Sequence, residues 1–317
     1  MNKMVKVFAP VSIGNVSVGF DSLGLALKPI DGELLGDLVT VETHQDNNDF
    51  VLQGKFAQRL PANKESNIVW DVVLAFEAAL QQQNIKTTPI KITLDKNIPV
   101  CSGLGSSACS VVATVVALNE FYGKPFDDSK LLIMMGEAEG KISGSLHYDN
   151  VAPCFLGGLQ LMIPKQQQVA LQLPVFDSVY WVLAYPDVLI STQAARDLLP
   201  KHYDRETLIH FGQNLAGFVA ASYEKNLELA FAMISDEIAE PYRAELLPDF
   251  QTTKQTMLDM NSLAMGISGS GPTVFSACRT LEEAQQQASW LKLNYLQSDE
   301  GFVSICQIDQ QGTRKIQ

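Results

Sequence analysis

Apolar residues recur along this chain with two different periods, and the period separates expected strands from expected helices. In the first forty residues, short apolar runs such as Val5 to Phe8 and Leu38 to Val41 alternate with Gly, Ser, Asn and Asp, which predicts strands joined by loops. From about Ile68 to Gln82 the apolar residues recur at helical spacing, and Asn67 before them is a residue type that caps helices. We therefore expect a strand-rich start, followed by a helix that packs on a sheet.

The rest of the chain predicts further strands and helices in alternation. No repeat with a period of roughly 20 to 50 residues is present, which excludes a solenoid. The segment from Pro164 combines a proline with a short polar tract, so we place a boundary near residues 164–172, between an N-terminal domain of residues 1–168 and a C-terminal domain of residues 169–317. Strands are expected over residues 90–94, 159–163, 179–185, 273–278 and 302–308, and helices over about 107–122, 128–141, 205–224, 227–239 and 281–293.

Composition narrows the class of protein. The chain has 317 residues, a net charge of -12 and 18% charged residues, so it offers no basic surface that could follow a nucleic-acid backbone. Its five cysteines are scattered without a C-x-x-C pair, which indicates reduced thiols and not a disulfide framework or zinc site. The longest apolar run, Val111 to Leu118, is far shorter than the roughly 18 residues of a membrane span. We expect a soluble protein of the cytoplasm that binds neither nucleic acid nor membrane.

One segment is rich in glycine and serine and precedes an apolar helix. Such a loop lets the backbone approach a ligand closely, and the helix N-terminus offers free N–H groups to an anion. In a chain poor in Lys and Arg, phosphates would be held in this way, with help from serine hydroxyls and a metal ion. The predicted phosphate-binding loop consists of Pro99, Val100, Cys101, Ser102, Gly103, Leu104, Gly105, Ser106, Ser107, Ala108 and Cys109.

Three other interpretations of this loop can be compared with the sequence. A Walker-type P-loop requires a lysine after its last glycine, and none occurs between Pro99 and Asn119. Gly103, Gly105 and Ala108 match the dinucleotide spacing G-x-G-x-x-A, but the polar stretch D-K-N-I-P-V-C-S separates the expected strand from the first glycine. A close-packed turn without a ligand is the third interpretation, and the loop alone does not decide against it.

The loop resembles the P-x-x-x-G-L-G-S-S-A signature of the GHMP kinases, a superfamily of small-molecule kinases. Two further segments, Pro10 to Gly24 and Gly266 to Thr273, resemble its other motifs and occur in the same order. The resemblance implies a two-domain α+β fold, with an N-terminal domain similar to domain 2 of ribosomal protein S5 and a ferredoxin-like C-terminal domain. It also implies ATP and Mg²⁺ as cofactors, bound with the acceptor in the cleft between the domains. Cys101 and the pair Ser17-Val18 depart mildly from the family pattern.

Within the superfamily, three segments are most similar to the branch that phosphorylates the side-chain hydroxyl of L-homoserine in threonine biosynthesis. They are Gly19 to Gly24, His147 to Gly158 and Ala239 to Arg243. A zwitterionic acceptor needs an anionic partner for its ammonium and a cationic partner for its carboxylate, for which Asp21 and an arginine are suited. A homodimer is expected from the family only. The resemblance implies an acceptor pocket made of Asn15, Asp21, His147, Asn150, Arg196, Arg243 and Gly269.

The same resemblance implies roles in catalysis. Ser107 and Glu139 would hold Mg²⁺, whereas Glu137 is the competing carboxylate, and the two glutamates point about 200° apart on a helix. Asn150 would orient the acceptor hydroxyl. Although Asp149 is nearby, no side-chain base is expected to be obligatory, because phosphoryl transfer depends mainly on positioning and charge neutralisation.

Several alternatives stay open at this level. Kinases of the same fold act on other alcohols such as mevalonate, a related lyase decarboxylates mevalonate diphosphate, and a ligand sensor could bind ATP and an amino acid without turnover. For single residues, Arg196 could be a solvated surface arginine and His147 a hydrogen-bonding histidine of the interior. Ile68 and Val69 resemble the adenine-facing segment of the family, but their spacing favours a core helix.

Overall fold

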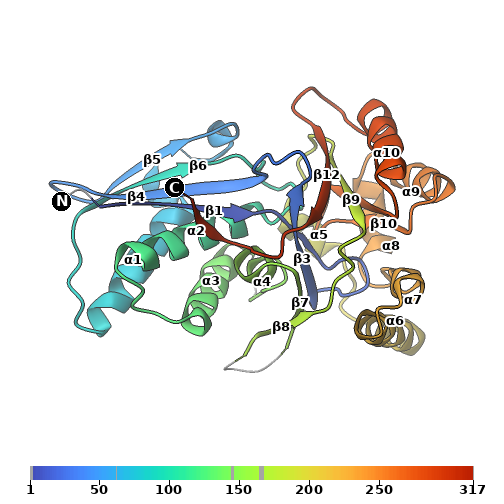
Figure 1. Cartoon of the computed structure of the whole chain (residues 1–317), viewed down its shortest axis with the longest axis horizontal. Coiled ribbons are helices and arrows are strands. Elements are labelled where there is room, and N and C mark those ends of the chain that lie inside the picture. The colour runs from blue at the N-terminus through green and yellow to red at the C-terminus, as the bar shows by residue number, and fades with distance from the viewer. Residues whose placement is uncertain (1–2, 62, 144–145, 164–167, 317) are drawn as a thin grey trace.

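The structure is a computed structural model that describes residues 3–61, 63–143, 146–163 and 168–316, and it consists of two sheets with helices packed against them (Figure 1). The strands are β1 Met4–Pro10, β2 Ser12–Gly14, β3 Leu23–Pro29, β4 Gly36–Thr43, β5 Asp49–Gln53, β6 Ile90–Asp95, β7 Leu159–Met162, β8 Ala170–Leu173, β9 Tyr180–Tyr185, β10 Ala264–Ile267, β11 Val274–Cys278, β12 Phe302–Ile308 and β13 Arg314–Ile316. The α-helices are α1 Ile68–Gln82, α2 Ser106–Phe121, α3 Asp128–Ser143, α4 Val151–Leu156, α5 Thr192–Asp197, α6 Arg205–Tyr223, α7 Leu227–Ala232, α8 Glu240–Arg243, α9 Phe250–Asp259 and α10 Leu281–Asn294. The expected α+β class is confirmed.

Local sequence signals explain where the principal helices begin. The side chain of Asn67 accepts a hydrogen bond from the N–H of Val69, which caps α1 at the predicted residue. Helix α10 begins with a capping box between Thr280 and Glu283. Helix α2 begins after Gly105, whose φ of 64° places it in the left-handed region that favours glycine.

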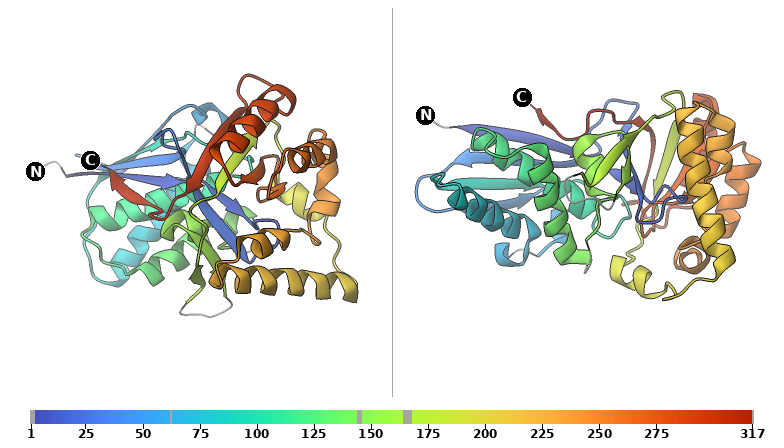
Figure 2. Two further views of the ribbon diagram at one scale, coloured as in Figure 1. Left: turned by 45° about the vertical axis from the view of Figure 1, so that its right-hand side comes forward. Right: turned by 90° about the horizontal axis from the view of Figure 1, so that it is seen from below.

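The first sheet has five strands in the order β13-β1-β4-β6-β5. Strand β1 pairs antiparallel with both β4 and β13, so the end of the chain returns to the sheet in which it began. Helices α1, α2 and α3 cover one face of this sheet, and α2 packs directly on β1 and β4 (Figures 1 and 2). Because nearly every side of α2 is buried, its N-terminus is fixed firmly relative to the sheet.

The second sheet has the order β10-β11-β9-β12-β3-β7-β8, with β2 paired to β3. Strands β2, β3 and β7 come from the first half of the chain and β9 to β12 from the second, and antiparallel pairing of β12 with β3 joins them. Helix α10 packs on β9 and β12 (Figure 2). The division into residues 1–168 and 169–317 stays a prediction: residues 164–167 of the boundary segment lie outside the described residues, and among the described strands three pairings, β1 with β13, β3 with β12 and β7 with β8, cross the division.

One predicted helix is wrong in extent, and several short elements were not predicted. The expected helix over residues 227–239 ends at Ala232 as α7. Its predicted second half is broken because the Asp236 carboxylate accepts hydrogen bonds from the N–H groups of Ile238 and Ala239, a local bond that competes with helical pairing. Helices α4, α5, α8 and α9 are too short for apolar periodicity to predict them. Within the described residues, no helix combines the length and apolarity needed to cross a bilayer.

Candidate active site

A cavity of about 450 Å³ lies where α2, α3, α4 and the β2–β3 connection meet segments from the second half of the chain. It extends from Leu60, Asn67 and Ile68 at one end to Arg196 and Arg243 at the other. The glycine and serine loop lines the part between them. The cavity therefore has two ends separated by a candidate phosphate site.

The loop is shaped by residues with positive φ and is held by the C-terminal part of the chain. Gly103 has a φ of 79°, and a Cβ there would lie 2.4 Å from the carbonyl oxygen of Ser268. The Ser268 hydroxyl donates to the Gly103 carbonyl at 2.6 Å, and the Thr273 hydroxyl donates to the Ser102 carbonyl at 2.6 Å. The segment Gly266 to Thr273 thus holds the backbone of the glycine and serine loop in place through the hydroxyls of Ser268 and Thr273.

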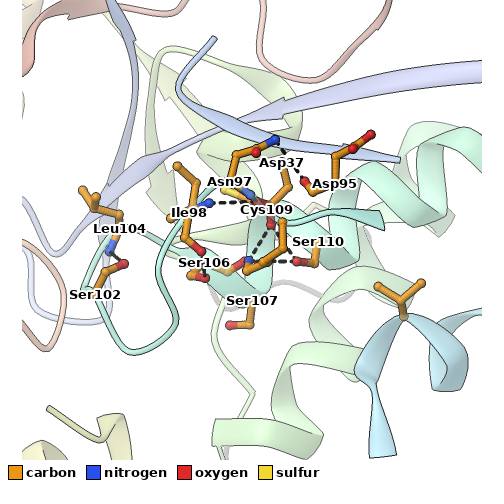
Figure 3. A network of polar contacts seen from close by, with 12 residues as sticks. Asp37, Asp95, Asn97, Ile98, Ser102, Leu104, Ser106, Ser107, Cys109 and Ser110 are labelled. Carbon is orange, nitrogen blue, oxygen red and sulfur yellow. Dashed lines mark hydrogen bonds and ion pairs between the residues drawn. The ribbon is translucent and has the colours of Figure 1, made fainter. Parts of the chain in front are cut away.

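A buried ion pair supports the base of the loop. The Lys96 ammonium donates to Asp37 at 2.5 Å, to the Ser106 carbonyl at 2.7 Å and to the Ser110 hydroxyl at 3.0 Å. The other carboxylate oxygen of Asp37 accepts hydrogen bonds from the N–H groups of Asn97 and Ile98, as Figure 3 shows. Both charged side chains are at most 1% exposed. No local sequence pattern predicts this pair, because Asp37 lies on β4 and Lys96 lies just after β6.

The candidate metal ligands lie together. The Ser107 hydroxyl in the first turn of α2 donates a hydrogen bond of 2.5 Å to Glu139 on α3. The pKa of Glu139 is raised above its usual value by burial. The hydrogen bond from Ser107 and the charge of Lys96 lower the pKa, but burial has the larger effect. Glu137 is exposed and does not line the cavity. A hydroxyl and a carboxylate next to a phosphate loop are hard oxygen donors, which fit Mg²⁺.

At the opposite end of the cavity, Asp21 is the centre of a charged group. Its carboxylate accepts two hydrogen bonds from Arg196, of 3.0 and 3.2 Å, and Nδ1 of His147 lies 3.5 Å from Oδ1. The pKa of His147 is lowered, mainly by burial, which favours a neutral imidazole. Asp21, expected to meet the ammonium of a zwitterion, is thus paired in this structure with Arg196, one of the two arginines predicted to line the acceptor pocket.

A second arginine is anchored by backbone oxygens. Arg243 is 3% exposed, and its Nε and Nη1 donate to the carbonyls of Ala195 at 3.1 Å and Gly269 at 3.0 Å. The Gly269 carbonyl also accepts from Nδ2 of Asn15 at 3.2 Å. A guanidinium carries five N–H groups, so Arg243 can hold these carbonyls and still donate to a carboxylate in the cavity.

Asn150 and Asp149 stand between the phosphate loop and this charged end. Nδ2 of Asn150 donates to Oδ2 of Asp149 at 3.3 Å. Burial, and secondly the charge of Asp21, raise the pKa of Asp149 to about 7. Oxygen and nitrogen ligand atoms of Asp21, His147 and Asp149 all lie within 4.8 Å of one another. This arrangement gives a cation or an ammonium group several acceptors at one point.

The structure brings most of the predicted site residues to one cavity. All seven predicted acceptor residues and both predicted metal ligands line it, as do seven residues of the loop, whereas Pro99, Leu104, Ala108 and Cys109 are buried outside its lining. Val69 is fully buried, whereas Ile68 packs against the hydrophobic core and also lines the cavity, so the core interpretation is confirmed for Val69 and describes only part of the surroundings of Ile68. The cavity is also lined by residues outside every predicted site or motif, among them Leu60, Ser66, Asp71, Lys96, Ser110 and Thr192.

Two family models and several solved structures are similar to this chain. The family model for the GHMP kinases N terminal domain matches residues 67–158, and the model described as GHMP kinases C terminal matches residues 218–295. A homoserine kinase from Cytophaga hutchinsonii ATCC 33406 is 34% identical, with a TM-score of 0.89 over 99% of this chain and 97% of that one. A putative homoserine kinase from Listeria monocytogenes is 19% identical, with a TM-score of 0.72 over 99% of this chain and 100% of that one. The L. major mevalonate kinase is 14% identical, with a TM-score of 0.69 over 97% of this chain and 96% of that one.

The fold is the two-domain architecture of a family of small-molecule kinases. With two family models and a whole-length relative in agreement, this chain belongs to the GHMP kinases.

Proposed function

We propose that this chain transfers the γ-phosphoryl group of ATP to the side-chain hydroxyl of L-homoserine, giving O-phospho-L-homoserine in threonine biosynthesis. The observation that carries the proposal is the charge pattern at the acceptor end of the cavity. Carboxylates of Asp21 and Asp149 lie on one side, and the guanidinium groups of Arg196 and Arg243 lie close by. The relative that is 34% identical over the whole chain has the same activity in its name.

The opposite charges suit a zwitterion. An ammonium group at Asp21 would share that carboxylate with Arg196, since each carboxylate oxygen accepts more than one hydrogen bond. A substrate carboxylate would take the free N–H groups of Arg243. Mevalonate carries a carboxylate but no ammonium, so it would add negative charge to a pocket that already holds Asp21 and Asp149 without bringing the cation that a zwitterion brings. The likeness to mevalonate kinases supports the shared fold only.

The phosphate loop and its neighbours would position ATP. N–H groups at the start of α2 and the serine hydroxyls would bind phosphate oxygens, and Lys96 would add positive potential beneath them. Ser107 and Glu139 would hold Mg²⁺, which when bound neutralises charge on the phosphates. Leu60, Asn67 and Ile68 would contact the nucleoside at the far end of the cavity. Asn150, between the two ends, would orient the acceptor hydroxyl toward the phosphoryl group.

One assay tests the substrate. ADP release would be measured with homoserine, mevalonate, galactose and shikimate, and the mass of each product would be determined. Homoserine should give rapid release and a product heavier by one phosphoryl group. If homoserine is inert at millimolar concentration while another alcohol reacts, the chain is a kinase of a different substrate. If ADP release fails with every alcohol although ATP binds, a non-catalytic sensor is the better description.

A further inference from the structure

Asn150 occupies a helix N-cap position, yet its side chain does not cap the helix. It precedes α4, and its side chain makes no hydrogen bond to the first turn. The first turn of α4 has no suitable N–H group for the Asn150 side chain to cap. The N–H of Ala152 already donates to the Tyr148 carbonyl at 2.7 Å, and Pro153 has no N–H. Asparagine at an N-cap normally accepts from one of these two positions. The side chain is therefore available for another task.

That side chain is held by Ser12. The Ser12 hydroxyl donates to Oδ1 of Asn150 at 2.9 Å, while Nδ2 of Asn150 donates to the carboxylate of Asp149 at 3.3 Å. A hydroxyl can donate and a carboxylate oxygen accepts. The two bonds together therefore fix the amide orientation, with Oδ1 facing Ser12 and Nδ2 facing Asp149. The second N–H of Nδ2 remains for a group in the cavity that Asn150 lines.

Ser12 also contacts the phosphate loop. It is fully buried on β2, and its backbone N–H donates to the Leu104 carbonyl at 3.3 Å. A Cβ on Gly105 would lie 2.4 Å from the Ser12 hydroxyl oxygen and 3.0 Å from Oδ1 of Asn150. The loop, Ser12 and Asn150 are thus packed so closely that only glycine fits at position 105.

We propose that Ser12 is a positioning residue: it orients the Asn150 amide so that Nδ2 donates to the acceptor hydroxyl, and it sets the distance from that amide to the phosphate loop. The inference rests on the proposed role of Asn150 in phosphoryl transfer. An amide N–H cannot accept a proton, so Asn150 held in this way orients the nucleophile without acting as a base. Small errors in such alignment are costly, on the order of 100-fold for a misplacement of about 1 Å.

A double-mutant cycle tests the inference. kcat and KM would be measured for the wild type, Ser12→Ala, Asn150→Ala and the double variant, with whichever alcohol the wild type phosphorylates. Ser12→Ala should lower kcat on the order of 10-fold to 100-fold with little change in the KM for ATP. In the Asn150→Ala background, Ser12→Ala should cause no further fall in kcat, because its effect passes through the missing amide.

Two additional variants separate positioning from stability. Ser222→Ala is the matched control, since Ser222 is also buried and its hydroxyl donates to the Phe218 carbonyl at 2.8 Å within α6, and it should leave kcat unchanged. Ser12→Cys keeps the shape with a weaker donor, and it should lower kcat like Ser12→Ala while unfolding at nearly the wild-type temperature. It replaces Ser12→Ala in the cycle if the alanine variant does not fold.

The possible failures can be told apart. If Ser12→Ala or Ser12→Cys lowers kcat by the same factor with and without Asn150, Ser12 acts independently and the inference is overturned while the kinase assignment stands. An inert homoserine beside another active alcohol overturns the proposed substrate, and the cycle is run with the active one. A wild type that phosphorylates no alcohol overturns the proposed function and this inference together.

Discussion

The hydroxyl of Ser107 donates a hydrogen bond to Glu139, 32 positions later in the chain, at a distance of 2.5 Å. Ser107 lies in the first turn of α2 and Glu139 near the end of α3, so the contact joins the glycine and serine loop to a neighbouring helix. Glu137, only two residues earlier, is exposed. The helix geometry that separates i from i+2 thus allows one of the two glutamates to reach the loop.

Glu139→Gln should lower kcat on the order of 100-fold and raise the Mg²⁺ concentration needed for half-maximal rate. The amide keeps a similar shape but loses the charge that a hard cation prefers. Glu137→Gln is the matched control and should behave as the wild type does. Steady-state rates across a magnesium titration measure both effects. An unchanged magnesium dependence in Glu139→Gln, with a changed one in Glu137→Gln, would reverse the assignment.

Lys96→Met should destabilise the protein on the order of 3 to 5 kcal/mol and raise the KM for ATP. The variant leaves the Asp37 carboxylate buried without its cation, which is more costly than removing both charges. Lys96→Met combined with Asp37→Asn should recover part of the stability, since asparagine can still accept from the N–H groups of Asn97 and Ile98. Urea unfolding measures the stabilities. A double variant no more stable than Lys96→Met would contradict this account.

Gly105→Ala should weaken ATP binding by about 10-fold or more, whereas Gly123→Ala should not affect it. Both glycines have positive φ, 64° and 83°, so each substitution should cost about 1 kcal/mol of stability from backbone strain. Only at Gly105 would the new Cβ meet another group, the Ser12 hydroxyl oxygen at 2.4 Å, while the space around Gly123 is open. Titration calorimetry with ATP compares the two. Equal affinities would show that the loop tolerates displacement at this point.

Arg243→Gln should raise the KM for homoserine on the order of 10-fold to 100-fold, the typical effect of losing a charge-assisted hydrogen bond. Because Arg243 also holds the carbonyls of Ala195 and Gly269, its loss could disturb the pocket in general. The analogue 3-aminopropan-1-ol, which lacks the carboxylate, controls for this. Its kcat/KM should be similarly low in both enzymes. A variant that loses activity equally with both alcohols would argue against contact between Arg243 and the carboxylate.

Asp149→Asn should flatten the dependence of stability on pH between about 4 and 7. The pKa of Asp149 is raised from 3.8 to about 7, chiefly by burial, so in this window the folded state holds a proton that the unfolded state has released. Stability therefore falls as pH rises through the window, by an amount on the order of a few kcal/mol. Unfolding midpoints of both proteins at pH 5 and pH 8 measure this. If the two proteins lose equal stability toward pH 8, another group titrates there.

Local sequence patterns were sufficient to predict the helices and strands in which those patterns are strong. Asn67 and the apolar spacing after it predicted α1 with its observed bounds, and the strand expected over residues 302–308 has the observed bounds of β12. The helix predicted over residues 227–239 failed because periodicity cannot detect a competing side-chain bond such as that of Asp236. Short helices such as α5, which carries Arg196, give too few apolar positions to be predicted.

The sequence by itself determined that a loop of glycines and serines precedes a buried helix, because such a loop depends on backbone freedom and hydrogen bonding within one short segment. Only the tertiary structure decided which distant groups meet this segment. It paired Lys96 with Asp37, turned Asn150 toward Ser12, and joined Asp21 to Arg196 across 175 positions of the chain. Such contacts depend on how sheets and helices pack, and side-chain periodicity records which face of an element is buried but not what lies opposite it.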